Sequence, residues 1–118
     1  MYYAIYADIN CLTCPTGHPE MKTSDASELS NIIAKSGSWK QWCKHLEVTM
    51  STCSVLDYSR DRDTDKALEV AKAYLKQVGT CWEKVVEVLC KKLIEPDHRA
   101  ARDLAQKHSL TYSMICEA

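Results

Sequence analysis

Residues 65–93 read DKALEVAKAYLKQVGTCWEKVVEVLCKKL, and this stretch decides the fold. Its apolar residues recur at spacings of three and four, the pattern of a helix with one buried face. The pattern predicts a helix from Asp65 to Gln77, followed by Gly79 where a C-terminal cap glycine belongs. Thr80 and Glu83 then form a capping-box pattern, which predicts the start of the next helix. The predicted apolar faces are Ala67, Leu68, Val70, Ala71, Tyr74, Leu75 and Val78 in the first of these helices and Trp82, Val85, Val86, Leu89 and Leu93 in the second.

Three shorter helices are expected before this stretch. The first is expected at residues 25–35 and ends at Gly37. The second begins near Ser38, and the third, which Thr49 or Ser51 caps, is short. Their apolar residues are Leu29, Ile32 and Ile33 in the first helix, Trp39, Trp42, Cys43 and Leu46 in the second, and Cys53, Val55 and Leu56 in the third.

A sixth helix completes the predicted bundle. Pro96 is expected in its first turn, where the missing N–H of proline costs nothing. The chain then divides into an irregular segment at residues 1–24, a helical bundle at 25–108, and residues 109–118 as a frayed tail or a seventh short element. The aromatic anchors expected in the core are Trp39, Trp42, Tyr74 and Trp82.

Composition restricts the class of protein. With 118 residues the chain is one domain, and its net charge of -1 gives no general attraction to nucleic acid or to an anionic membrane. No apolar run is long enough to span a bilayer, and residues 1–9 lack the basic region of a secretory signal. Seven cysteines are an odd number, unlike a secreted disulfide scaffold. We therefore expect a cytoplasmic protein whose helical cysteines are buried, reduced thiols, namely Cys43, Cys53, Cys81 and Cys90.

The order of the anchor residues resembles the death-domain family. Residues 39–48, WKQWCKHLEV, resemble the second-helix signature of that family, with Trp42 and Cys43 where Leu and Ala are usual. Tyr74 falls where the family often has a Trp late in its fourth helix. Residues 80–89, TCWEKVVEVL, resemble the fifth-helix motif. The resemblance covers residues 25–108, most of the chain.

The resemblance implies an all-α fold, a six-helix antiparallel Greek-key bundle. It also implies a non-enzymatic adaptor module of apoptotic or innate-immune signalling. Such a module assembles with other death-fold domains, either copies of itself or domains of receptors and effectors, and needs no cofactor, nucleic acid or membrane insertion. A shared fold does not by itself fix a function, so this remains an expectation.

Two charged corners of the predicted bundle are candidate partner-binding surfaces. The connection between the third and fourth helices mixes both signs of charge, and a merely solvated loop is the alternative explanation. The corner between the fifth and sixth helices is more basic, so the two corners could pair between copies. The candidate contact residues are Arg60, Asp61, Arg62 and Asp63 at one corner and Lys91, Lys92, Asp97 and Arg99 at the other.

Metal and enzyme sites are weakly indicated. Cys11, Cys14 and His18 form a CxxC followed by a histidine, but a structural zinc site needs four ligands. Cys43 and His45 lie two residues apart on a helix and so point to different faces, which argues against a Cys–His catalytic pair. We expect no catalytic residue and no bound metal.

A small helical DNA-binding module, similar to helix-turn-helix proteins, is the alternative function. Basic residues continue from the fourth helix to the sixth, which favours this alternative. Acidic residues interleave them throughout, whereas a recognition helix has a denser basic and amide face.

Overall fold

The computed structural model describes residues 20–117, and within this range the chain is helical throughout, without strands. The prediction of an all-α fold is confirmed. A 3₁₀ turn, η1 (Thr23–Asp25), precedes the first α-helix, and α6 continues as a π-helical turn, η2 (Val88–Lys92). The α-helices are α2 (Ala26–Lys35), α3 (Trp39–His45), α4 (Met50–Tyr58), α5 (Asp63–Leu75), α6 (Trp82–Glu87), α7 (His98–Lys107) and α8 (Tyr112–Cys116).

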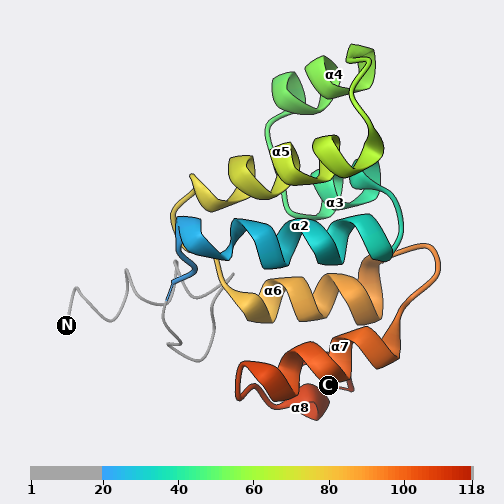
Figure 1. Ribbon diagram of the computed structural model, residues 1–118. Helices are drawn as coiled ribbons and strands as arrows, with labels where there is room; N and C mark the ends of the chain where they lie inside the picture. Colours follow the sequence, from blue (N-terminus) through green and yellow to red (C-terminus); the bar gives the residue numbers. More distant parts are fainter. Residues whose placement is uncertain (1–19, 118) are drawn as a thin grey trace.

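Helix α2 lies at the centre of the molecule, with α5 on one side and α6 on the other (Figure 1). The pair of α2 and α5 runs antiparallel and forms the most extensive helix packing of the described chain. Helix α4 lies beyond α5 at one end of the bundle, whereas α7 and α8 pack on α6 at the opposite end. The two ends of the bundle are therefore built from different elements and present different surfaces.

Trp42 is the largest fully buried side chain of the core. Its indole Nε1 donates a hydrogen bond of 2.6 Å to the carbonyl oxygen of Ser36, which ties α3 to the end of α2. Trp39 and Tyr74 are also buried, as predicted, and the hydroxyl of Tyr74 accepts a hydrogen bond of 3.2 Å from the backbone N–H of Cys81. The other side chains that are completely or almost completely buried include Leu29, Ile33, Leu46, Val70, Val85, Val86, Val88 and Leu89.

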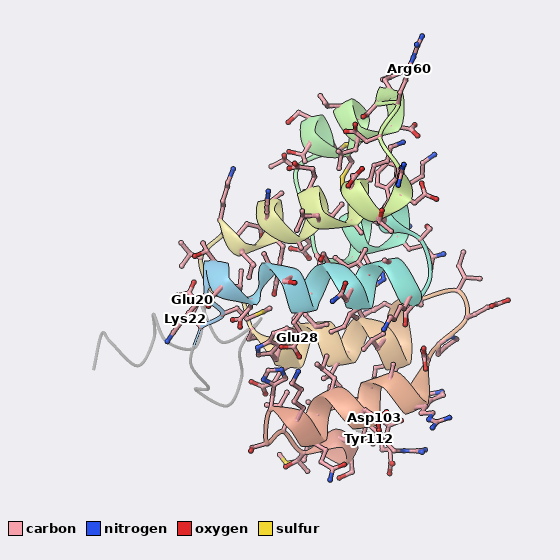
Figure 2. The ribbon with its side chains drawn as sticks, in the orientation of Figure 1. Glu20, Lys22, Glu28, Arg60, Asp103 and Tyr112 are labelled. Atoms are coloured by element: carbon pink, nitrogen blue, oxygen red, sulfur yellow. A yellow bond between two sulfur atoms is a disulfide. The ribbon has the colours of Figure 1, made fainter. Side chains whose placement is uncertain are left out.

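Trp82 packs against the edge of this core and is only partly buried, so its prediction as a buried core anchor is wrong. It stacks on His108, with ring centroids 4.2 Å apart. Trp82 is the first residue of α6, and this end of the helix lies at the edge of the bundle. The ring nitrogen Nε2 of His108 and the ammonium of Lys107 each lie 3.0 Å from the same carboxylate oxygen of Glu28 (Figure 2). This cluster joins the start of α2, the start of α6 and the end of α7.

The starts of two helices differ from the prediction. Thr80 does not cap α6, because the N-cap residue is Cys81 and the buried Thr80 hydroxyl has no hydrogen-bond partner among residues 20–117. Pro96 does not lie in the first turn of α7, because the N-cap there is Asp97. The Asp97 carboxylate accepts hydrogen bonds of 3.0 Å from the backbone N–H of Ala100 and of 3.0 Å from the Ser36 hydroxyl.

The turn between α2 and α3 depends on a glycine, as predicted. Gly37 has a φ of 74°, in the left-handed region that other residues seldom adopt. A Cβ atom at this position would lie 3.0 Å from a methyl group of Leu93, in the loop after η2. Gly37 therefore serves two purposes at one point of the chain: it adopts a positive φ, and it lets the Leu93 side chain approach the backbone closely.

Cys43, Cys81 and Cys90 are buried as predicted, whereas Cys53 is only partly buried. The prediction of reduced thiols is wrong for Cys43, Cys53 and Cys90. Cys43 on α3 forms a disulfide with Cys53 on α4, and Cys90 in η2 forms one with Cys116 in α8. A helical pattern places a cysteine on the apolar side whether it is a thiol or half of a disulfide, so the pattern could not separate the two states. The second disulfide also attaches a short helix in the region for which a frayed tail was one expectation.

None of the described helices is both long enough and apolar enough to cross a bilayer.

Candidate interaction surfaces

Four of the predicted contact residues lie together at the corner between α4 and α5. Arg60, Asp61, Arg62 and Asp63 are all exposed. The backbone N–H of Asp61 donates a hydrogen bond of 3.1 Å to the Ser59 hydroxyl, which shapes the turn. Arg62 is the N-cap residue of α5. The carboxylate of Asp63 lies in the first turn, where the positive end of the helix dipole stabilises it. Figure 2 shows Arg60 projecting away from the body of the molecule.

Exposed apolar side chains lie beside these charges on α4. Met50 is 84% exposed, Val55 68% and Tyr58 90%, so the predicted inward position of Val55 is wrong. Cys53 and Leu56 are three residues apart and share the inner face of α4, which turns Val55 outward. We call Met50, Val55, Tyr58 and residues 60–63 together the α4 corner.

A hollow of about 410 Å³ adjoins this corner, between α4 and α5. Val55 and Leu56 give it an apolar side, and Asp61 and Glu69 place carboxylates at its margin. Sequence reasoning missed this arrangement because it assigned the apolar residues of α4 to the core. The sequence did contain a signal of this arrangement. Ser51, Val55 and Tyr58 are spaced by four and three residues, so they share one face of the helix, and the polar serine indicates that this face is turned to solvent.

The second predicted group of contact residues is divided into two. Lys91 and Lys92 are exposed at the end of η2. Asp97 and Arg99 lie beyond the following loop and line a hollow of about 670 Å³ near the end of α2. The carboxylate of Asp97 is already engaged in the two hydrogen bonds that start α7 and reach Ser36, so it has a structural role. Sequence reasoning missed Ile94, which is 81% exposed at the margin of this hollow.

Lys92 belongs instead to a basic cluster around His45, at the end of α3. Burial lowers the pKa of His45 below the ordinary value of 6.5, and the positive charges of Lys44, Lys92 and Lys84 lower it further. Lys84 also pairs with Glu87 at 3.5 Å. We call Lys44, His45, Lys84, Lys91 and Lys92 the basic end. It differs in charge from the α4 corner, where carboxylates and guanidinium groups alternate.

Glu28 has a perturbed pKa for a different reason. Burial alone would raise it, but the hydrogen bonds and positive charges of His108 and Lys107 outweigh burial and hold the pKa below 4.5. The charged form of the carboxylate is therefore favoured in the cluster with Trp82. Because Glu28 keeps some exposure to solvent, the stabilisation that its carboxylate gains from His108 and Lys107 is screened by water.

Acidification should lower the free energy of unfolding in two separate steps. The first begins as the pH falls below about 6.5, because the unfolded chain then binds a proton that the folded site at His45 disfavours, and it ends at the lower folded pKa. The second begins below about pH 4.5 and is completed as the Glu28 carboxylate is protonated in the folded state. Urea unfolding at a series of pH values measures both steps. His45→Gln should reduce only the first and Glu28→Gln only the second; identical profiles for all three proteins would contradict these assignments.

The remaining sequence predictions concern metal and catalysis. Cys11, Cys14 and His18 lie outside the described residues. Within residues 20–117, no three side chains of the metal-binding types come together to form a cation site.

Comparison with known protein families, with curated proteins and with solved structures gave no match for this chain.

Proposed function

We propose that this chain is a non-enzymatic adaptor module with the Greek-key death fold. It associates with other death-fold domains, including copies of itself, in apoptotic or innate-immune signalling. The observation that carries the proposal is the α4 corner, which combines three exposed apolar side chains with four exposed charges of both signs. Mixed charges around an apolar patch give specificity and orientation to a protein contact, and the buried apolar area gives affinity.

The basic end supports a heterologous contact, in which two different surfaces meet. Lys91 and Lys92 are exposed, and neither lysine forms a salt bridge within residues 20–117. Asp61 and Asp63 at the α4 corner are likewise exposed. A contact between the α4 corner of one copy and the basic end of the next leaves one surface of each kind unoccupied. Further copies can then be added in the same way.

Charge reversal tests this contact. The double variant Asp61→Lys, Asp63→Lys should weaken self-association about tenfold or more, because it places lysines opposite the basic end. Lys91→Glu, Lys92→Glu should have a similar effect. Sedimentation velocity over a range of protein concentrations measures the association. Mixing the two double variants should restore it, because the reversed corner then meets a reversed basic end.

Two controls make the result specific. The double variant Asp103→Lys, Glu117→Lys changes the net charge by the same amount as Asp61→Lys, Asp63→Lys. Both positions are exposed, and Asp103 lies at the end of the bundle opposite the α4 corner (Figure 2). This variant should associate like the unchanged protein. Circular dichroism checks that each variant is folded, since Asp63 lies in the first turn of α5. Unchanged association of both double variants, or no recovery on mixing, would count against the heterologous contact.

A further inference from the structure

The two disulfides of the described chain each attach a short peripheral helix to the bundle. Cys43–Cys53 joins α4 to α3 with 6.3 Å between the Cα atoms, and Cys90–Cys116 joins α8 to η2 with 5.9 Å. The attached helices lie at opposite ends of the molecule (Figure 1). Each of them buries very little: α8 contributes no fully buried residue and α4 contributes only Leu56. Each helix therefore has a covalent link in addition to limited packing, which for α8 involves Tyr112 and Ile115 and for α4 Leu56 and Cys53.

The non-covalent attachment of α4 is weak. A helix of nine residues is marginal in water unless packing supports it. Its one ion pair within residues 20–117, Lys40 to Asp57 at 2.7 Å, joins side chains that are 62% and 51% exposed, and exposed pairs contribute little to stability. Val55 and Tyr58, which could have packed, point into solvent instead. The disulfide is therefore the strongest of the links that keep α4 on α3 and α5.

We propose that Cys43–Cys53 is a thiol–disulfide exchange site, and that its reduction by a dithiol releases α4 from the bundle. Cys53 is the sulfur open to attack, because it is partly exposed on the outer helix, whereas Cys43 is 1% exposed. A thiolate of the dithiol bonds to the Cys53 sulfur, and the Cys43 sulfur leaves and takes up a proton. The second thiol of the reductant then bonds to the first, and Cys53 is released as a thiol. The dithiol loses two electrons and becomes a disulfide, and the protein gains two thiols.

The two states differ in what holds α4. In the oxidised protein the helix is fixed, and with it residues 60–63 that follow it in the α4 corner. In the reduced protein the contacts that hold α4 within residues 20–117 are the packing of Leu56 and of the partly buried Cys53 and the exposed ion pair, so α4 opens locally while the rest of the bundle stays folded. Cys43 remains on α3 as a small buried apolar residue, which a core tolerates well. Reduction therefore changes the shape of one surface and leaves the core intact, whether or not that surface binds the proposed partner.

Amide hydrogen exchange with and without dithiothreitol tests the proposal on the unchanged full chain. Mass spectrometry of peptides covering residues 50–58 should show exchange about tenfold faster or more in the reduced protein. Peptides from α5, on which α4 packs, should keep their protection. Alkylation of the thiols before digestion reports whether Cys43 and Cys53 were bonded and whether the reductant opened the bond. An unbonded pair in the untreated protein, a bond that resists the reductant, or equal loss of protection in α4 and α5 would each overturn the proposal.

Two variants separate this site from the other disulfide. Cys90→Ser, Cys116→Ser removes the bond at the opposite end of the molecule, and its α4 peptides should still respond to the reductant. Cys43→Ser, Cys53→Ser should exchange rapidly in α4 without reductant and should not respond to it. If that variant does not fold, the measurements on the unchanged chain and on the first variant still decide. An α4 response that disappears with the Cys90–Cys116 bond would assign the effect to the wrong site.

Discussion

Replacing Trp42 with alanine should lower the free energy of unfolding by about 3–5 kcal/mol, the usual cost of removing a fully buried aromatic side chain. The substitution also deprives the buried Ser36 carbonyl of the indole N–H that bonds to it at 2.6 Å. An unpaired buried acceptor adds about 1–3 kcal/mol. Since small domains unfold at a cost of about 5–15 kcal/mol in total, this variant should be close to unfolding at room temperature. Urea unfolding followed by circular dichroism measures the loss.

Two further variants distinguish the causes of that loss. Trp42→Phe keeps much of the packing but removes the N–H, so it isolates the contribution of the hydrogen bond to Ser36. Trp82→Ala removes a partly buried ring that stacks on His108, and it should cost only about 1–2 kcal/mol. An equal or greater loss for Trp82→Ala than for Trp42→Ala would contradict the placement of Trp42 inside the core and of Trp82 at its edge.

Helical periodicity was enough to locate the elements of the bundle. The helix expected from Asp65 to Gln77 is α5, Asp63–Leu75, because its apolar residues repeat over three turns and Gly79 follows them. Periodicity describes one helix at a time, however, and burial depends on what packs against each turn. Trp82 fits the apolar face of its helix as well as Val85 does, yet it lies at the edge of the bundle, and only Val85 is fully buried.

Short helices were the least predictable part of the candidate site. In α4 the three apolar residues of the predicted face are nearly consecutive, and at 100° per residue they cannot all point inward. Leu56 is buried and Val55 is exposed, so the apolar part of the α4 corner was concealed in what was taken for core. Local sequence also cannot show which cysteines meet in space. The partners Cys90 and Cys116 are 26 residues apart, with a whole helix between them.

The charged parts of the site were easier to find because charges in a loop stay exposed in almost any packing. Residues 60–63 lie at one corner as expected, since they are adjacent in sequence. Arg99 and Lys92 are separated by a loop, and only packing could decide whether they share a surface. Lys92 instead lies close enough to His45 on α3 for its charge to lower the pKa of that histidine, an interaction between residues 47 positions apart that no local pattern records.

Leu29→Ala should lower the free energy of unfolding by about 3–5 kcal/mol and tests whether α2 is the centre of the bundle. Leu29 is completely buried on α2, which packs most extensively on α5. Removing its side chain leaves a cavity. The surrounding side chains cannot move in to fill it, because each is fixed by its own contacts. Asn31→Ala, at an exposed position of the same helix, should change the stability by less than about 0.5 kcal/mol. Urea unfolding of the two variants beside the unchanged protein measures both effects. Similar small losses for both would mean that α2 lies on the surface of the bundle, and that the packing of α5 and α6 alone forms the core.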